Sequence, residues 1–369
     1  MTADAGIPRE RLSVRAKWTA LVVLTIGILV LLLAAAEIAI RLRQTLRYGT
    51  ASTIEDTYTV DPRLGLRVPI ANLVKGHIAV NSLGFRGPEI RVPKPPGTVR
   101  LAFIGASTTW CGEVSGNDKV WADIVAKSLA QAFPAHHFDY VNGGVPGYTI
   151  PASRKNLELR VAPLAPDVIV IYEGMNDLSG ELREVAAAKG VARDAKMEPA
   201  SRLADYSLLW NLAEKNLRVW FAQQRVQTSK GRLVLDASAL GDGFRRDLTG
   251  LVQAAQQRAK RVAVATFSIQ LRSGQSADEQ LRAAASRLYY EPFMTPQGII
   301  DAYRRYNEIV REVAAATGAL LVDGEDDIPG DPAHFTDTVH FTDAGSAAMA
   351  ARVTRALVSD PAIRELGSK

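Results

Sequence analysis

Short apolar runs alternate with longer amphipathic segments from residue 99 to the end of the chain. The short runs are nearly continuous in apolar or β-branched residues, which is typical of parallel strands covered on both faces; they lie at 99–104, 138–141, 168–172, 262–267 and 319–322. Between or after them come amphipathic stretches of helical length, at 121–133, 250–259, 299–316 and 343–358. The alternation predicts an α/β fold, a three-layer α/β/α sandwich around a mostly parallel five-stranded sheet.

The beginning of the chain follows a different pattern. Residues 18–36 form an uncharged run of 19 residues dominated by Leu, Val, Ile and Ala, with basic residues on both sides. At about 1.5 Å per residue a helix of this length extends roughly 28 Å, which is enough to cross the hydrocarbon core of a membrane. We therefore interpret 18–40 as a single transmembrane anchor that follows a short tail, residues 1–17.

A cleaved signal peptide is the alternative for this segment, because Ala34-Ala35-Ala36 would suit a signal peptidase. The apolar run is, however, longer than the usual central region of a signal peptide, about 7 to 15 residues. Four basic residues precede the span and three follow it closely, which slightly favours a cytoplasmic N-terminus. In that orientation everything after residue 43 lies outside the cytoplasm.

Residues 41–97 contain no long helical pattern but many turn formers, which end in the run Pro93-Lys94-Pro95-Pro96-Gly97. This composition predicts a stalk and an irregular lead-in with short strands. The remaining residues, 98–369, are expected to form the main domain.

Two intervals of this domain, near 178–245 and 268–297, are too long for simple crossover connections. Both leave from the carboxyl ends of predicted strands, the edge at which open α/β sheets place their ligands. We expect cap-like insertions that face a substrate. The first also holds aromatic residues on a predicted amphipathic helix, for which packing inside the protein is the simpler interpretation; they are Tyr206, Trp210, Trp220 and Phe221.

The net charge of +5 suggests nucleic-acid binding only until its distribution is considered. Residues 1–47 hold seven Arg or Lys against three acidic residues, or +4, which leaves 37 basic and 36 acidic residues, or +1, in the rest. The main domain is thus almost neutral, and we expect no nucleic-acid partner. Cys111 is the only cysteine, so no internal disulfide can form; burial is its simplest role.

An Asp and a His three residues apart, Asp337 and His340, are the first candidates for chemistry. A carboxylate held beside an imidazole fixes its tautomer and lets it act as a base toward a serine hydroxyl. Ser107 directly follows the first predicted strand, where its hydroxyl would be exposed at the carboxyl edge of the sheet. Alternatively, Ser107 simply hydrogen-bonds a turn, or His334, Asp337 and His340 bind a metal ion.

Acyl transfer also requires donors for an oxyanion. The turn Asn142–Gly147 follows the second predicted strand, and its glycines would let a backbone N–H approach a substrate. The turn Glu173–Asp177 follows the third, and Asn176 carries a side-chain amide. Taken singly, each of these turns is also common as a purely structural feature.

In chain order, the serine turn, glycine turn, asparagine turn and Asp-x-x-His resemble the four sequence blocks of the SGNH hydrolases, also called the GDSL esterase and lipase family. The resemblance covers roughly residues 99–350 and implies a flavodoxin-like SGNH fold and no cofactor. It implies Ser107 as nucleophile, His340 as general base and then acid, and Asp337 as its partner. It further implies an oxyanion hole formed by the N–H groups of Ser107 and Gly147 and the amide of Asn176.

One position departs from the family pattern, because the namesake Gly-Asp-Ser-Leu is here Gly105-Ala106-Ser107-Thr108. Ala106 supplies no carboxylate to order the turn. The stretch Asn81–Gly87 resembles a lead-in of membrane-tethered bacterial members, in which we expect a structural role and, for Arg86, an ion-pair partner. The ordinary α/β-hydrolase elbow, Gly-x-Ser-x-Gly, does not fit, because Thr109 occupies its last position.

The resemblance implies a serine esterase or acylhydrolase that cleaves carboxylic esters. The location of a tethered, outward-facing domain suggests esters of envelope glycans or lipids, with acetyl esters as the first expectation. An anchored domain of this kind would be periplasmic or extracellular and attached to the membrane through 18–40. Two alternatives stay open from the sequence: an O-acyltransferase acting on a glycan with the same residues, and a catalytically silent protein that binds glycans or supports an envelope complex.

Overall fold

The structure is a computed structural model that describes residues 13–48, 57–191, 201–227 and 232–366. It divides into two compact units, residues 1–51 with 200–214 and residues 52–199 with 215–369. The second unit contains the sheet and all the residues singled out for chemistry, and each unit is described separately below.

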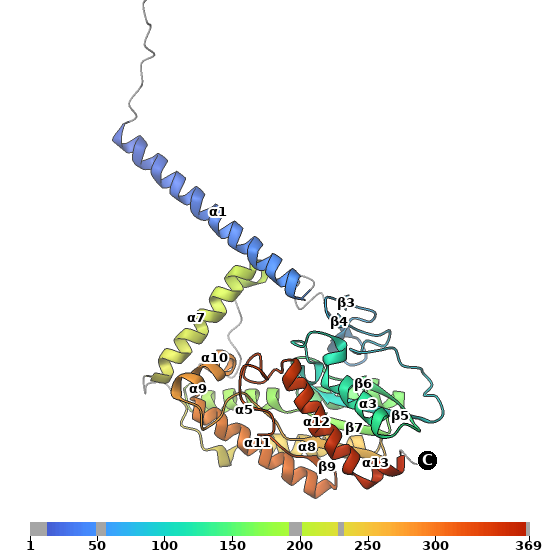
Figure 1. The fold of residues 1–369 in the computed structure, drawn as a ribbon. Helices are drawn as coiled ribbons and strands as arrows, with labels where there is room; N and C mark the ends of the chain where they lie inside the picture. The colour runs from blue at the N-terminus through green and yellow to red at the C-terminus, as the bar shows by residue number, and fades with distance from the viewer. Residues whose placement is uncertain (1–12, 49–56, 192–200, 228–231, 367–369) are drawn as a thin grey trace, which may run out of the picture. The chain divides into compact units, whose positions relative to one another are not determined.

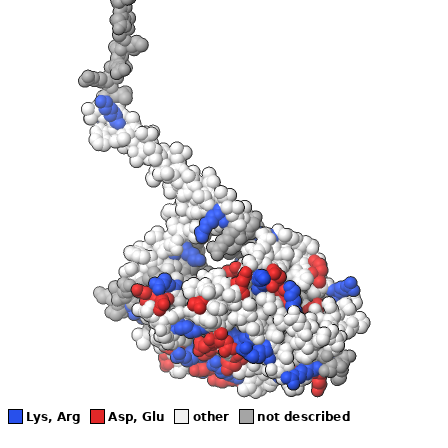
Figure 2. Space-filling model, viewed as in Figure 1, with Lys and Arg blue, Asp and Glu red and all other residues white. Residues whose placement is uncertain are grey.

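The first unit is dominated by one long helix, α1 (Val14–Tyr48). Its segment Val14–Leu46 is long and apolar enough to cross a membrane, and none of its most apolar part is buried inside the protein. Figure 2 shows a stretch without charged groups between basic groups at the two ends of this helix. The predicted apolar N-terminal helix is therefore confirmed, although length and composition alone also fit a signal sequence.

Just beyond the apolar run, Glu37 holds the segment 201–214 against α1. Its carboxylate accepts hydrogen bonds from the Ser207 hydroxyl and from the N–H groups of Leu208 and Leu209, at 2.8 to 3.0 Å. These contacts satisfy the free N–H groups at the start of α7 (Leu208–Gln227), which follows the short helix α6 (Arg202–Tyr206).

The second unit is built on the predicted five-stranded parallel sheet, in the order β6-β5-β7-β8-β9. This is the flavodoxin-like order, with β5 at the point where the chain direction across the sheet reverses. All eight residues of β5 are buried, as expected for a strand covered on both faces. The strands are β5 (Thr98–Gly105), β6 (His137–Asn142), β7 (Val168–Tyr172), β8 (Arg261–Ala265) and β9 (Leu320–Val322).

Helices cover both faces of the sheet, so the predicted three-layer architecture is confirmed (Figure 1). On one face α3 (Trp121–Ala132) packs against α12 (Asp343–Ser359), and on the other α8 (Asp242–Gln256) packs against α4 (Ile150–Asn156) and α11 (Pro296–Thr317). Shorter or peripheral helices complete the unit: α5 (Met175–Ala188), α9 (Ala277–Ala283), α10 (Ala285–Tyr290) and α13 (Pro361–Leu366).

The lead-in contains the predicted short strands, which pair as two antiparallel hairpins: β1 (Tyr58–Asp61) with β2 (Leu66–Pro69), and β3 (Val74–Lys75) with β4 (Ile78–Ala79). The expected ion pair of Arg86 is wrong for the described residues. Its guanidinium donates instead to the carbonyl oxygens of Trp110 and Cys111 and to the Asn117 side chain. Its Nε and Nη1 atoms are thus bonded to the Asn117 side chain and to carbonyl oxygens at the end of the turn that carries Ser107, while Nη2 is buried without a hydrogen-bond partner among the described residues.

Two local predictions are corrected by the structure. Residues 175–177 form the first turn of α5, not an isolated turn, because Gly174 adopts a positive φ of 134° and directs the chain straight into the helix. The predicted packing of the aromatic residues in 206–221 is also wrong. Their exposed fractions range from 47% to 81%, for Tyr206, Trp210, Trp220 and Phe221.

Candidate active site

Ser107 lies where β5 ends and the one-turn helix α2 (Ser107–Trp110) begins. The turn is tight, since Cys111 adopts a left-handed conformation (φ 56°) and its N–H returns to the Ser107 carbonyl at 2.8 Å. As the first residue of a helix, Ser107 has a backbone N–H without an acceptor inside that helix. Both its hydroxyl and its N–H are therefore placed at the carboxyl edge of the sheet.

Asp337 and His340 lie on a loop after β9 and form a relay to this serine. The Asp337 Oδ2 atom is 2.9 Å from His340 Nδ1, and His340 Nε2 is 2.9 Å from Ser107 Oγ. The other carboxylate oxygen accepts the N–H groups of Val339 and His340, at 2.9 and 3.0 Å. Residues 233 positions apart in sequence thus meet in hydrogen-bonding geometry.

The electrostatics of this pair favour an imidazolium. Burial alone lowers the pKa of His340, but attraction to Glu113 and the hydrogen bond and charge of Asp337 outweigh it, and the pKa rises from 6.5 to about 9. Burial raises the pKa of Asp337, but the hydrogen bond and charge of His340 outweigh this effect and lower the pKa from 3.8 to about 2. The site is therefore arranged to stabilise a proton on His340.

The glycine turn after β6 approaches Ser107 closely. A Cβ atom on Gly144 would lie 2.5 Å from the Trp110 backbone nitrogen, so only glycine allows this contact with α2. Gly147 has a φ of 84°, a conformation that side chains disfavour. The side chain of Asn142 fixes the turn, since it donates to the Thr109 carbonyl and accepts the Gly144 N–H, both at 3.0 Å.

The start of α5 is tied to the same turn. The Asn176 amide donates to the Tyr148 carbonyl at 2.7 Å, which uses one of its two N–H bonds and leaves the second for another acceptor. Asp177 accepts the Ile150 N–H, and burial raises its pKa from 3.8 to about 6. The buried Glu173 accepts the Ser153 hydroxyl at 2.5 Å, and burial together with the Asp177 charge raises its pKa well above the usual range.

All five residues predicted for the site, Ser107, Gly147, Asn176, Asp337 and His340, line one cavity of about 660 Å³. Both predicted insertions contribute to its wall, through Ser179, Arg183 and Lys215 from the first and Ser286, Arg287 and Tyr290 from the second. The loop that carries Asp337 and His340 is attached to the second insertion, since Thr338 Oγ1 donates to the Ala283 carbonyl at 2.5 Å and accepts from the Ser286 hydroxyl at 2.9 Å.

Sequence reasoning named none of five charged residues of this cavity; three of them, Arg183, Lys215 and Arg287, lie in the predicted insertions, whereas Arg67 and Glu113 lie outside them. Arg67 comes from β2 in the lead-in, and Glu113 follows the turn that carries Ser107. Glu113 lies in the concave wall with part of its side chain open to solvent, where desolvation by the surrounding protein raises its pKa and the charge of His340 partly offsets that rise. No spacing or motif distinguishes either residue in the sequence, because only the fold brings them to Ser107.

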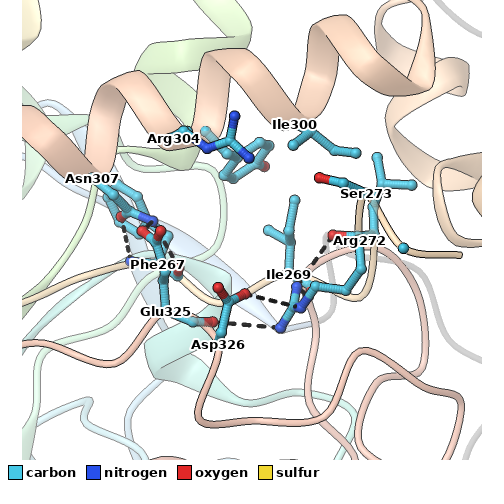
Figure 3. A pocket seen from close by; sticks show the side chains of 12 residues that line it. Phe267, Ile269, Arg272, Ser273, Ile300, Arg304, Asn307, Glu325 and Asp326 are labelled. Carbon is cyan, nitrogen blue, oxygen red and sulfur yellow. Dashed lines mark hydrogen bonds and ion pairs between the residues drawn. The ribbon is translucent and has the colours of Figure 1, made fainter.

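A second cavity, of about 360 Å³, lies beside the ends of β8 and β9 (Figure 3). Its charged groups are engaged with their neighbours: Arg272 pairs with Asp326 at 3.1 Å, and Glu325 accepts from the Asn307 amide. Ser273 is the serine among its lining residues, and no His lines this cavity in the part of the chain described. The cavity therefore lacks the groups that activate a nucleophile.

The structure does not bring together the three residues of the alternative metal site, His334, Asp337 and His340. His334 pairs with Asp331 at 2.8 Å, whereas His340 is engaged by Asp337 and Ser107. Within the described residues, no group of three or more His, Cys, Asp or Glu side chains is placed to hold a metal ion.

The comparison with protein families agrees with this geometry. The model of the GDSL-like lipase/acylhydrolase family matches residues 103–348. A search of curated proteins finds no match. Among solved structures, the chain is similar to the acetylxylan esterase Axe2 from Geobacillus stearothermophilus, with 18% identity over 72% of this chain and 95% of that one and a TM-score of 0.42. It is also similar to LAE5, an alpha/beta hydrolase enzyme from the metagenome of Lake Arreo, Spain, with 19% identity over 70% and 94% of the chains and a TM-score of 0.40. At these TM-scores the similarity carries no conclusion about substrate.

Proposed function

The chain belongs to the GDSL-like lipase/acylhydrolase family of carboxylic ester hydrolases, and we propose that it is a serine esterase in which Ser107 forms a covalent acyl-enzyme. The observation that carries the proposal is the relay from Asp337 through His340 to Ser107, with 2.9 Å at both steps. An unassisted serine hydroxyl is a poor nucleophile, and this relay supplies the base that it needs.

In the first half of the reaction, Ser107 Oγ attacks the ester carbonyl carbon while His340 Nε2 takes the hydroxyl proton. Asp337 holds the imidazole in the required tautomer and stabilises its positive charge. The tetrahedral intermediate then collapses, the bond to the leaving oxygen breaks, and His340 returns its proton to the departing alcohol. In the second half, His340 deprotonates a water molecule as it attacks the acyl-Ser107 carbonyl. The second tetrahedral intermediate then collapses, the bond from the acyl carbon to Ser107 Oγ breaks, and His340 returns its proton to Ser107 Oγ as the carboxylic acid leaves.

The oxyanion of both tetrahedral intermediates is held by three donors: the N–H groups of Ser107 and Gly147 and the second N–H of the Asn176 amide. The hydrogen bond from Asn176 to the Tyr148 carbonyl supports this assignment, because it fixes the amide beside the glycine turn before substrate binds. Preorganised donors of this kind need no reorganisation when charge develops on the oxygen.

The acyl group is proposed to be short, with acetate as the first expectation. Among the described residues of the cavity wall, Leu, Ile and Phe are absent and the aliphatic side chains are Ala106, Pro146, Met175 and Val339, which is a limited surface for a long acyl chain. Residues 18–40 are proposed to anchor the protein in a membrane, with the catalytic domain, residues 98–369, periplasmic or extracellular and acting on envelope glycans. Its cap is proposed to consist of the segments near 178–245 and 268–297.

A serine-directed fluorophosphonate tests the proposal. Labelling and hydrolysis of phenyl acetate are expected for the wild type, and both should disappear in Ser107→Ala. His340→Ala should lose on the order of three decades or more in rate, since the nucleophile is no longer activated. Ser273→Ala, in the second cavity, is the matched control and should behave as the wild type. Hydrolysis by His340→Ala at a rate near that of the wild type would refute the mechanism.

The anchor is tested separately in cell membranes. Full-length protein should stay with the membrane in alkaline carbonate, and protease added outside the cytoplasmic membrane should digest its catalytic domain. Release of a shortened, soluble chain would instead support a cleaved signal peptide.

A further inference from the structure

The charges around the active-site cavity are unevenly compensated. Four cationic side chains line it: Arg67, Arg183, Lys215 and Arg287. Arg287 and Arg183 are compensated by the buried carboxylate of Glu291, with nitrogen to oxygen distances of 3.1 and 3.6 Å. Arg67 and Lys215 form no ion pair with any of the described residues.

The acidic side chains of the cavity leave little negative charge to balance these two cations. Asp337 is engaged by His340, and the raised pKa of Glu173 favours its neutral form. Glu113 is the remaining acid of the cavity. Its negative charge is the largest of the influences that stabilise the His340 imidazolium. On the face drawn in Figure 2, by comparison, acidic and basic groups are mixed.

Arg67 is positioned for recognition. Its guanidinium carbon lies 4.9 Å from the centroid of the Tyr58 ring, and its Nη2 donates to the Pro146 carbonyl at 3.1 Å. A Cβ built on Gly147 would lie 3.4 Å from the same Nη2 atom, so the positive charge stands next to the glycine turn of the site. The side chain is held at two points while its other N–H groups remain available to a ligand.

A guanidinium fixed in this way fits a carboxylate, which it can bind through two parallel hydrogen bonds. The neighbouring wall favours a sugar over a lipid. The partly exposed ring of Tyr58 provides an apolar face with a polar edge beside the arginine, and the buried ring of Trp110 packs against it at a centroid distance of 6.0 Å and an interplanar angle of 52°. The wall also lacks, among its described residues, the Leu, Ile and Phe side chains that would receive lipid chains.

We propose that the substrate is an acyl ester of an acidic glycan, and that Arg67 binds a sugar carboxylate while the ester lies against Ser107. Lys215, on α7 in the first insertion, adds long-range electrostatic attraction for a polyanionic chain. This inference rests on the proposed esterase function and adds to it the chemical class of the alcohol part of the ester.

The test compares two substrates with the same acetyl esters and different charge: an O-acetylated oligouronide, and the same acetylated oligosaccharide with its carboxyl groups converted to neutral primary amides after acetylation. Acetate release gives kcat/KM for each with the full-length protein in detergent. The wild type should prefer the acidic substrate by about tenfold or more, as expected for a charge-assisted bidentate contact, and added salt should reduce the preference.

Arg67→Gln should reduce the ratio of the two kcat/KM values by about tenfold, whereas Arg67→Lys should retain part of it. The ratio is the decisive quantity, because loss of the contact with Pro146 would slow both substrates alike. Arg63→Gln is the matched control: Arg63 lies in the loop of the same hairpin, is exposed and pairs with Asp61, and its loss should leave the ratio unchanged.

Equal Ser107-dependent rates on the two oligosaccharides would overturn the inference and leave the esterase function intact. If Arg67→Gln keeps the preference for the acidic substrate, Arg67 is not the residue that binds the carboxylate. If acyl groups are released faster from phospholipid vesicles than from the acidic oligosaccharide, the substrate is not a glycan. Absence of any Ser107-dependent ester hydrolysis, phenyl acetate included, would instead reject the proposed function itself.

Discussion

Replacing Glu113 by Gln should shift the pH dependence of catalysis without touching the relay. His340 must be neutral to accept the Ser107 proton, so kcat/KM should rise with pH and level off above the pKa of His340, about 9. Of the influences that raise this pKa, Glu113 is the largest, ahead of the hydrogen bond and the charge of Asp337. Removing its negative charge favours neutral imidazole, so the midpoint should move to lower pH.

The size of the shift follows from the same values. The pKa of His340 rises by about 2.5, from 6.5 to about 9, although burial opposes the rise. Glu113 is the largest of the influences that raise it, ahead of the hydrogen bond and the charge of Asp337, so its removal should reverse a substantial part of the rise. We expect the midpoint to fall by on the order of one pH unit in Glu113→Gln, which corresponds to about 1.4 kcal/mol.

The assay is kcat/KM for phenyl acetate, followed by acetate release from about pH 6 to 10, a range that spans both the ordinary and the raised pKa. Glu158→Gln is the matched control, since Glu158 lies on the surface in a pair with Arg154, and its profile should match that of the wild type. A wild-type midpoint near 6.5, or a Glu113→Gln midpoint equal to that of the wild type, would contradict the reasoning.

Two further predictions concern the oxyanion donor and the core. Asn176→Ala should lower kcat by roughly two to three decades with little change in KM, since one donor to the oxyanion is lost; a change in KM alone, measured by steady-state kinetics, would assign Asn176 to binding. Asp139→Ala should destabilise the fold by about 3 to 5 kcal/mol, because it strands the buried guanidinium of Arg100, which Asp139 binds at 2.7 and 2.8 Å. Chemical denaturation should show this loss, against less than about 1 kcal/mol for the exposed control Glu158→Ala, and equal losses would refute the argument.

The sheet could be predicted because its pattern is local. Each of the five strands is short and nearly continuously apolar, and the observed bounds differ from the expected ones by at most two residues; the third, Val168–Tyr172, is identical. The predicted start of a helix was wrong where the helix continues through a polar stretch of sequence. The helix expected at 250–259 begins at Asp242, because Phe244 and Leu248 extend its buried stripe through a polar stretch.

The sequence by itself determined these members of the candidate active site, because Ser107, Asn176, Asp337 and His340 stand at strand ends or in a short motif, and the ends of parallel strands meet at one edge of a sheet. The tertiary structure alone decided what surrounds them. Arg67 arrives from a lead-in hairpin, and Glu113 acts on His340 from another loop. Charge acts through space and not along the chain, so the pKa of His340 and the charge of the cavity depend on neighbours that no sequence pattern records.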